Sequence, residues 1–423
     1  MAIVDTAQTA AGTGSSVVVE RCQICDYAPL RRILFLGYLP PVNQMRTMGE
    51  LPKEQPAYPA LWLACPQCTL VQLGLIVDKE ILFPPEYPYT SGTTKILRNN
   101  FAELYSESQT IVPMRSGDLA VDIGSNDGTL LGNFLRGGHR VFGIEPSQVG
   151  TLANDRGIPT MIAFFGRAVA EQARRQHGLA KIITATNVFA HIEHIHDIME
   201  SILLLLDETG VFISESHYLL SLVEMLQYDT IYHEHLRYYS VRSLQYLLNM
   251  HGLEVIHAHR IPTHGGSVRV YAARKGRYSV QPSVAQILEE EDRAGLGAER
   301  LQSFKDRVVQ SKLDLYALLR GIKKQGQRIY GIGAPSRAST LINYVGLDDG
   351  ILDCVLEIKG SLKIGKYMPG TLIPVLEESH LYEGQPEYVL LLSWHIADEL
   401  IPKLKGKGYK GKYIIPLPAP RIV

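Results

Sequence analysis

A regular alternation of strand and helix signals over residues 118–274 constrains the fold of this chain more than any other feature. The strand signals occupy residues 118–123, 140–144, 160–164, 181–186 and 210–215. Helical patterns lie between them at residues 168–175 and 195–206. Because such alternation builds a parallel sheet with helices on both faces, we expect a Rossmann-like α/β domain. Residues 253–260 and 267–274 have only a short connection, which predicts an antiparallel pair at the sheet edge.

The turn after the first of these strands has the form of a cofactor site. In the run Val121-Asp-Ile-Gly-Ser-Asn-Asp-Gly128, the glycines let a ligand approach the backbone and the following helix offers free N–H groups. The turn is acidic, so it repels the pyrophosphate of a nicotinamide dinucleotide and favours the cationic S-adenosylmethionine. A tight turn without any ligand is the alternative. The residues predicted to bind the cofactor are Asp122, Gly124, Asn126, Asp127, Gly128, Glu145, Phe165 and Asn187.

Four of the five cysteines form two close pairs, Cys22 with Cys25 and Cys65 with Cys68. Two Cys-x-x-Cys knuckles supply the four thiolates of a tetrahedral zinc site, and such a site is structural because it leaves no position open. A redox pair, a DNA-binding ribbon and a coincidence are the alternatives. The fifth cysteine, Cys354, stands in an apolar run and is predicted to lie in a core.

The bulk properties exclude several classes of protein. A formal charge of -1 does not provide the basic field that nucleic-acid binding requires. No apolar run reaches the length of about 18 residues that indicates a membrane span. The first sixteen residues lack the pattern of a secretory signal and are predicted to be a disordered leader. We therefore expect a cytoplasmic protein that binds neither nucleic acid nor membrane and is a monomer or a small homo-oligomer.

Two clusters are rich in histidine, one after the fifth predicted strand and the other just after the fourth. Tyr232, His233, Glu234 and His235 are consecutive, and a histidine beside a carboxylate is suited to accept a proton near neutral pH. His191 belongs to the other cluster. Satisfied surface or core histidines are the alternative for each of these residues.

A second alternating unit begins at Tyr330-Gly-Ile-Gly-Ala-Pro-Ser-Arg337. A glycine turn followed by an arginine can hold a diphosphate. The basic loop that contains Lys363 suits phosphate and solvent equally. The chain is expected to comprise a leader (residues 1–16), a zinc-binding domain (17–80), an S-adenosylmethionine-binding domain (81–282), and a helical linker with a C-terminal α/β domain (283–423).

Taken together, these motifs and their order resemble the sugar C-methyltransferases that act on nucleotide-linked keto-deoxysugars in antibiotic and surface-polysaccharide pathways. The likeness also includes Tyr87-Pro-Tyr-Thr-Ser-Gly-Thr and His264-Gly-Gly-Ser-Val-Arg269, and it spans nearly the whole chain from Cys22. The family has a zinc-binding domain, a methyltransferase domain and a C-terminal α/β domain that helps to bind the sugar nucleotide. The resemblance therefore implies zinc and S-adenosylmethionine as cofactors and a nucleotide sugar as the partner.

The resemblance also implies methylation at carbon, most often C3 of a 4-keto hexose carried on thymidine diphosphate. His235 would be the base, with Tyr232, Glu234 and His191 around the reacting ring. The substrate-binding residues are expected to be Tyr89, His264, Arg337 and Lys363. Two other functions stay open: a nicotinamide-dependent keto-sugar oxidoreductase, alone or as a second activity, and a zinc-ribbon binding protein with an inactive methyltransferase domain.

Overall fold

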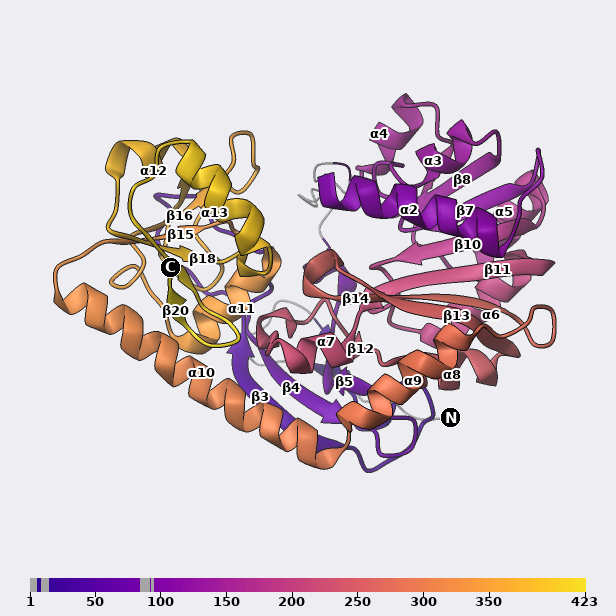
Figure 1. Cartoon of the computed structure of the whole chain (residues 1–423), viewed down its shortest axis with the longest axis horizontal. Coiled ribbons are helices and arrows are strands. Elements are labelled where there is room, and N and C mark those ends of the chain that lie inside the picture. The colour runs from indigo at the N-terminus through magenta and orange to yellow at the C-terminus, as the bar shows by residue number, and fades with distance from the viewer. Residues whose placement is uncertain (1–5, 9–14, 84–91, 93–94) are drawn as a thin grey trace.

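The computed structural model describes residues 6–8, 15–83, 92 and 95–423. A central lobe and a C-terminal lobe lie side by side, and N-terminal strands with a long helix run beneath both (Figure 1). The proline- and tyrosine-rich segment predicted as a linker or lid, including Tyr89, lies outside the described residues. Among the helices of the described ranges, none combines the length and apolar character needed to cross a bilayer.

The central lobe is built on a mixed sheet with the order β13-β14-β11-β10-β7-β8-β9. Its strands are β7 (Leu119–Ile123), β8 (Arg140–Glu145), β9 (Thr160–Ile162), β10 (Ala180–Thr186), β11 (Leu206–His217), β13 (Leu253–Ile261) and β14 (Ser267–Arg274). Strands β7 to β11 pair in parallel, whereas β14 and β13 form the predicted antiparallel edge. The Rossmann-like fold is therefore confirmed.

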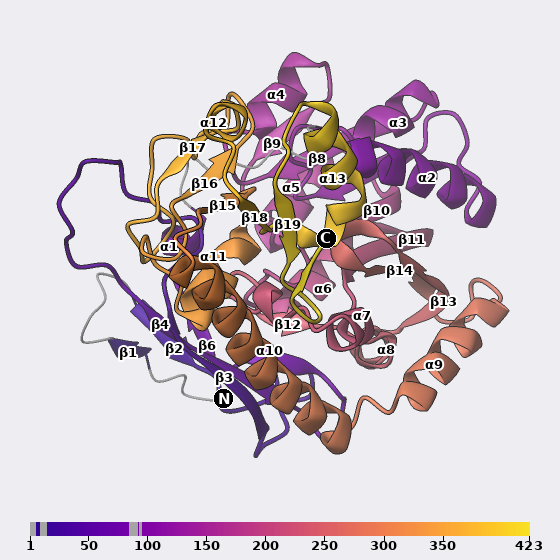
Figure 2. The ribbon, with the colours of Figure 1, turned by 60° about the vertical axis from the view of Figure 1, so that its left-hand side comes forward.

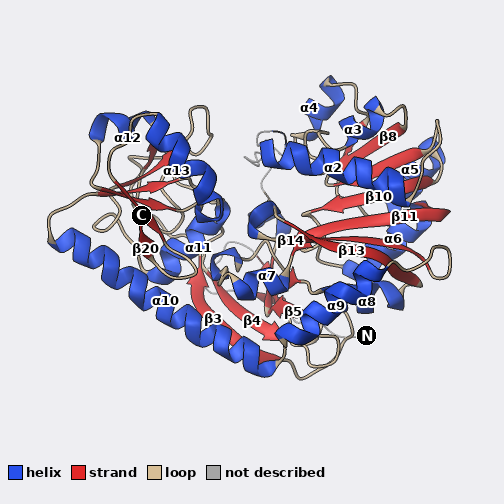
Figure 3. Cartoon of the chain, viewed as in Figure 1, coloured by secondary structure: helices blue, strands red, loops and turns tan. Residues whose placement is uncertain are grey.

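Helices lie on both faces of this sheet (Figure 3). They are α2 (Lys95–Ile111), α3 (Leu131–Arg136), α4 (Gly150–Asp155), α5 (Arg167–His177), α6 (Ile195–Leu205), α7 (Leu219–Glu224) and α8 (Val241–Met250). Local signals set their ends: Ser240 and Ser243 form a reciprocal capping box at the start of α8, and Gly178 ends α5 with a positive φ. All five residues of β7 are buried, as expected of a central strand that is covered on both faces of a parallel sheet.

The cysteine-bearing part of the chain forms a second sheet with the order β12-β5-β4-β3. The strands are β3 (Arg31–Leu39), β4 (Tyr58–Ala64), β5 (Val71–Leu73) and β12 (Arg237–Tyr238). Strand β12 comes from the central part of the sequence and pairs with β5. The N-terminal sheet is therefore completed by residues that the domain prediction assigned elsewhere.

The first residues differ from the predicted disordered leader. Strand β1 (Thr6–Gln8) pairs with β2 (Ser15–Val18), which in turn pairs with β6 (Leu75–Val77), just before the short helix α1 (Lys79–Leu82). Ser16 is buried. Regular structure thus begins before residue 17, because β2 finds a partner strand that lies far along the sequence.

The C-terminal lobe contains the second α/β unit. Its strands are β15 (Ile329–Ile332), β16 (Cys354–Glu357), β17 (Val375–Glu377), β18 (Tyr388–Leu391), β19 (Lys412–Ile415) and β20 (Arg421–Ile422), in the order β17-β16-β15-β18-β19-β20. Helices α11 (Ser336–Val345), α12 (Ser379–Gly384) and α13 (Ala397–Gly406) accompany them. Cys354 is buried in this core, as predicted.

Helices α9 (Pro282–Ala294) and α10 (Ala298–Lys324) connect the two lobes. Helix α10 runs along β3 (Figure 2) and buries a stripe that includes Leu301, Phe304, Val308 and Leu315. These residues share one continuous hydrophobic core with β3, α7 and the C-terminal lobe. The lobes are therefore held in a defined arrangement by packing.

Candidate active site and cofactor sites

The four paired cysteines converge on one point. Cys22 Sγ lies 3.4 Å from Cys68 Sγ, and Cys25 Sγ lies 3.5 Å from Cys65 Sγ. All four sulfur atoms lie within 4.8 Å of one another. A tetrahedral zinc ion with bonds of about 2.3 Å requires sulfur–sulfur separations of about 3.8 Å, so the cluster fits zinc with small adjustments.

Both knuckles have the same backbone form. The first cysteine of each donates its N–H to the carbonyl five residues later, at 2.9 Å for Cys22 and 2.8 Å for Cys65. The residue after each second cysteine, Asp26 or Thr69, has a positive φ of 57° or 61°. Two unrelated segments that adopt one strained turn indicate a shared ligand.

The zinc site is tied to the central lobe. The His196 side chain reaches the Ile24 carbonyl at 2.9 Å, and Gln67 donates to the Tyr246 hydroxyl at 3.0 Å. Arg237 of β12, fully buried, donates to the carbonyl of Glu193 at 2.6 Å and also to that of Ile192. His196 is a packing residue here.

The glycine turn of residues 124–128 follows β7 at the carboxyl edge of the central sheet. Gly124, Asn126 and Gly128 have φ values of 71°, 50° and 75°. A Cβ atom on Gly124 would lie 2.4 Å from Val188, so only glycine fits there. The turn therefore has the open, tightly bent backbone expected of a cofactor loop.

Two further predicted cofactor residues lie at the same edge. Glu145 ends β8, and its carboxylate accepts hydrogen bonds from the N–H of Asn126 at 2.9 Å and from Ser147. Asn187 follows β10 with a φ of 57°, and its N–H donates to the Glu215 carbonyl. The carboxyl ends of neighbouring parallel strands lie at the same edge of the sheet. Glu145, at the end of β8, and Asn187, after β10, therefore flank the glycine turn that follows β7.

The acidic character of the turn differs from the prediction. Burial raises the pKa of Asp122 to about 7, and its carboxylate accepts a hydrogen bond from the Thr184 hydroxyl at 2.6 Å. Asp127 accepts from Thr129 and forms an ion pair with Arg156 at 3.2 Å. The charges of both aspartates are thus offset within the protein, which leaves Glu145 as the carboxylate that accepts directly from the turn.

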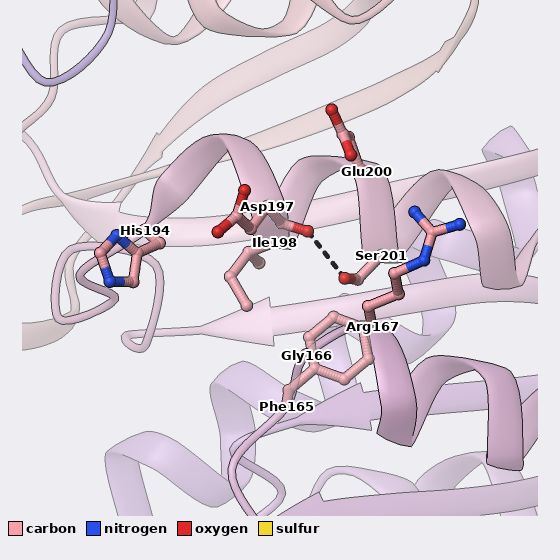
Figure 4. Close-up of a pocket in the computed structure, with 8 residues that line it drawn as sticks. All are labelled: Phe165, Gly166, Arg167, His194, Asp197, Ile198, Glu200 and Ser201. Atoms are coloured by element: carbon pink, nitrogen blue, oxygen red, sulfur yellow. Dashed lines mark hydrogen bonds between the residues drawn. The ribbon is translucent and has the colours of Figure 1, made fainter. Parts of the chain in front are cut away.

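Phe165 lines a cavity of about 350 Å³ between α5 and α6 (Figure 4). The other lining residues come from the start of α5, from α6 and from the residue before α6, and they include Arg167, His194 and Asp197. None of the glycine-turn residues contributes to this lining. Phe165 therefore lies near the carboxyl edge of the sheet without joining the turn in one cavity.

Histidines from four segments gather at the end of the central sheet. His191 follows β10, His217 ends β11, His264 precedes β14, and His235 lies between α7 and β12. The ring centroid of His235 lies 4.8 Å from that of His191 and 5.7 Å from that of His217. The Tyr232 ring lies 4.2 Å from the His235 ring. The predicted base, tyrosine and second histidine are thus brought together.

The hydrogen bond that orients His235 comes from an unexpected partner. Its Nδ1 atom donates to the Thr230 carbonyl at 2.8 Å, so Nε2 carries the lone pair. The sequence placed Glu234 beside this base, and in the structure its Oε1 accepts from Asn43 of the N-terminal part of the chain at 2.7 Å. Glu234 directly precedes His235 in an irregular segment, and its side chain contacts Asn43. The main-chain carbonyl of Thr230 is the acceptor that orients the His235 ring.

The site disfavours positive charge on its imidazoles. Burial lowers the pKa of His235 well below its ordinary value, and the neighbouring His191 and His217 lower it further. Burial likewise lowers the pKa of His191 to about 4 and that of His217 to about 3. His217 Nδ1 is buried without a hydrogen-bond partner in the described part of the chain. Burial therefore disfavours protonation of all three rings in the folded protein.

The C-terminal lobe contacts this site through its own glycine turn. Arg337, at the start of α11, forms a two-pronged ion pair with Asp229 at 2.8 Å and also donates to Gln227. Trp394 donates to the same Asp229 carboxylate at 2.7 Å. Arg337 was predicted as a phosphate ligand, but these donors are committed to a partner on the central lobe.

Lys363 also differs from the prediction of a flexible basic loop. Its side chain is half-buried, and its Nζ atom donates to the Ala334 carbonyl at 2.6 Å. Burial lowers its pKa. Glu234 lies close enough to act on it electrostatically. Lys363 therefore connects the second glycine turn with the histidine-bearing segment.

A cavity of about 810 Å³ lies between residues of the central lobe and residues of the C-terminal lobe, and His395 is the histidine among its lining residues. Gly265 and Gly266, which follow His264, line it from the central lobe. Trp394 and His395 line it from the C-terminal lobe. Its size falls in the range of small-molecule sites, which extends from about 300 to about 1,000 Å³.

The sequence interpretation missed His217, Thr230 and Asn43. His217 directly ends a strand at the carboxyl edge, and that position was the signal that could have identified it. Thr230 acts through its carbonyl, which no side-chain pattern reveals. Asn43 lies in a loop before β4 and has no motif around it.

Three family models match successive parts of the chain. Residues 22–83 match a model described as "Putative zinc binding domain", residues 99–258 a methyltransferase domain, and residues 262–418 a C-methyltransferase C-terminal domain. The chain is 32% identical over 409 residues to C-methyltransferase NovU of Streptomyces niveus, a match that covers 96% of this chain and 97% of that protein. The chain belongs to the sugar C-methyltransferase family. This C-methyltransferase uses S-adenosylmethionine and has a four-cysteine zinc-binding domain.

Solved methyltransferases resemble part of the C-methyltransferase. An S-adenosylmethionine-dependent methyltransferase from Clostridium acetobutylicum is 11% identical, with a TM-score of 0.33, over 44% of this chain and 94% of that chain. The magnesium protoporphyrin IX methyltransferase of Synechocystis is 13% identical, with a TM-score of 0.32, over 42% of this chain and 78% of that one.

Proposed function

We propose that this C-methyltransferase methylates C3 of a nucleotide-linked 4-keto-deoxysugar, carried on thymidine diphosphate, through an enolate. The observation that carries the proposal is His235, whose Nδ1 is fixed by the Thr230 carbonyl while Nε2 keeps its lone pair. A proton on carbon next to a ketone is removable because the resulting charge delocalises onto the ketone oxygen. A neutral imidazole held in one tautomer is suited to remove it.

In this proposal His235 Nε2 accepts the C3 proton. Burial and the neighbouring rings oppose a positive charge on His235. The enolate that forms beside it is negative, so the two charges stabilise each other as the proton moves. The base is therefore weak until the substrate reacts, which couples proton transfer to a bound ketone.

The neighbouring side chains are assigned supporting roles. Tyr232, whose ring centroid lies 4.2 Å from that of His235, donates a hydrogen bond to the enolate oxygen. His191 contacts the sugar ring of the substrate on the side away from Tyr232. Glu234 stabilises the imidazolium electrostatically rather than by orienting its ring, because the orienting bond goes to Thr230.

We propose that S-adenosylmethionine binds over residues 124–128, with its ribose hydroxyls on Glu145. The open backbone of the turn and the Glu145 carboxylate at the next strand end support this assignment. When bound, the cofactor supplies an electrophilic methyl group. The role of the protein is to align C3 with that methyl and to exclude water.

We propose that the nucleotide occupies the cavity between the lobes, with the sugar reaching His264 and the other histidines. Gly265 and Gly266 line this cavity and follow His264 directly, which supports continuity with the histidine site. Arg337 is then a positioning residue that holds the lobes in register through Asp229, and Lys363 supports the second glycine turn. Tyr89 stays a predicted substrate residue.

The decisive experiment combines the protein with methyl-labelled S-adenosylmethionine and a panel of nucleotide keto-sugars. We expect label on C3 of a 4-keto sugar, located by carbon NMR of the product. Sugars reduced at C4 should remain unlabelled because they cannot form the enolate. Label on oxygen or nitrogen, or equal labelling of the reduced sugars, would contradict the proposal.

A further inference from the structure

A second group of metal-binding side chains lies on the outer edge of the central sheet, apart from the cysteines and the histidine site. His257 and His259 are two residues apart on β13, so they point to the same face of the sheet. Helix α2 covers that face and places Glu107 above them. Strand alternation and helix packing thus bring two imidazoles and one carboxylate together.

The three donor atoms form a nearly equilateral triangle. His257 Nε2 lies 3.3 Å from Glu107 Oε1, His259 Nδ1 lies 3.4 Å from the same oxygen, and the two nitrogens are 3.2 Å apart. A tetrahedral ion with bonds of about 2.0–2.1 Å requires ligand separations of about 3.3–3.4 Å. The triangle therefore matches one face of a metal tetrahedron.

Neighbouring groups hold the ligands in this orientation. Tyr271 and Arg269 donate to the other oxygen of Glu107, Oε2, at 2.6 and 2.7 Å, which leaves Oε1 directed at the imidazoles. Ser283 Oγ lies 2.7 Å from His257 Nδ1 and fixes that ring. Supporting hydrogen bonds of this kind are characteristic of metal sites.

The charge balance also favours a cation. Arg269, the nearby positive group, is fully buried and forms ion pairs with both Glu107, at 2.7 Å, and Glu215, at 2.6 Å. Glu107, Glu215 and Arg269 together therefore leave one negative charge beside two imidazoles. The three ligand side chains keep 15–27% exposure, so an ion and a water molecule have access.

We propose that Glu107, His257 and His259 form a second metal site, which binds a divalent transition-metal ion such as Zn²⁺. Two nitrogens and one carboxylate oxygen suit zinc, cobalt or nickel better than magnesium or calcium. The ion clasps α2 to the edge strand β13. Helix α2 also carries Asn100, which donates to Glu215, so the clasp reinforces a buried polar network that spans helix and sheet.

Cobalt titration of full-length protein that carries one zinc ion per chain, at the cysteines, tests this site. Wild-type protein should bind one Co²⁺ per chain beyond the cysteine site, with visible d–d bands and no sulfur-to-cobalt charge-transfer band. His259→Ala should weaken this binding at least roughly 100-fold, and Ser283→Ala by about tenfold, as for a supporting hydrogen bond. Added Co²⁺ should raise the thermal midpoint of wild-type protein and leave that of His259→Ala unchanged.

His251→Ala is the matched control. His251 and His196 also form a close imidazole pair, at 2.8 Å, but without a carboxylate in the same cluster. The cobalt affinity of the His251→Ala protein should equal that of wild-type protein. Glu107→Gln, which keeps the side-chain shape, separates loss of the ligand from misfolding, and retained zinc at the cysteines verifies the fold. Absence of micromolar cobalt binding in wild type, or equal binding by His259→Ala, would overturn the proposal.

Discussion

The Nδ1 atom of His235 lies 2.8 Å from the carbonyl oxygen of Thr230, so a main-chain acceptor fixes the tautomer of the proposed base. A carbonyl cannot lose its acceptor role when a neighbouring side chain changes. The orientation of His235 should therefore tolerate substitution of Glu234, whereas the ring itself is indispensable.

His235→Asn should abolish exchange of the C3 proton with deuterated water, measured by proton NMR with S-adenosylhomocysteine bound. Glu234→Gln should slow exchange only about tenfold, because it removes electrostatic support and leaves the ring in place. Tyr232→Phe should slow exchange less than His235→Asn. His251→Asn, remote from the site, should exchange as wild type does. Wild-type exchange by His235→Asn would move the base to His191.

Glu145→Gln should weaken S-adenosylmethionine binding by about ten- to a hundredfold, measured by calorimetry. A hydrogen bond to a charged group contributes roughly 1.5–3 kcal/mol, which corresponds to that range. Glu171→Gln, a change of an exposed carboxylate on α5, should leave the affinity unchanged. An unaltered affinity in Glu145→Gln would place the ribose elsewhere.

Asp122 should make the stability of the protein depend on pH. Its folded pKa of about 7 lies above the unfolded value, mainly because of burial, so the folded state binds the extra proton between about pH 4 and 7. Stability should fall as pH rises through that window. Asp122→Asn should remove this loss while its side-chain oxygen still accepts from Thr184. Urea unfolding of both proteins at pH 5 and pH 8 measures the difference, and equal pH dependence would contradict the assignment.

Cys65→Ser should lower the zinc content by about one ion per chain and destabilise the N-terminal sheet. Zinc binding to small domains contributes about 10 kcal/mol or more at neutral pH, so its loss is not compensated by packing. Elemental analysis and the thermal midpoint provide the measurements. Cys354→Ser, at a cysteine outside the cluster, should keep the zinc. A metal-free protein with an unchanged midpoint would argue against a structural role.

Asp229→Asn should destabilise the protein by about 3–5 kcal/mol, because it leaves the buried Arg337 guanidinium without its charged partner. Asp292→Asn breaks an exposed ion pair with Arg242 and should cost less than about 1 kcal/mol. Unfolding midpoints in urea compare the two. Equal effects of both substitutions would show that Arg337 finds other partners.

The sequence was sufficient for features that arise from local patterns. Strands such as β7 and β10 are apolar runs between glycine turns and helices, and the Cys-x-x-Cys knuckles have fixed internal spacing. Strand β12 could not be predicted, because two residues show no periodicity and the partner β5 is distant in sequence. The ion pair between Arg337 and Asp229 was hidden for the same reason. The isolated arginine suited phosphate until the fold supplied a carboxylate.

The buried ion pair between Arg337 and Asp229, made by two hydrogen bonds, limits how this enzyme can be recombined with its relatives. A chimera that takes its C-terminal half from another homologue has the position of Arg337 from one parent and the position of Asp229 from the other. The two residues must therefore still match as an ion pair. Exchange at the α9–α10 connection should therefore succeed only when residues 227–231 travel with the incoming half. The boundary of the exchangeable unit is thus set by that ion pair rather than by the linker.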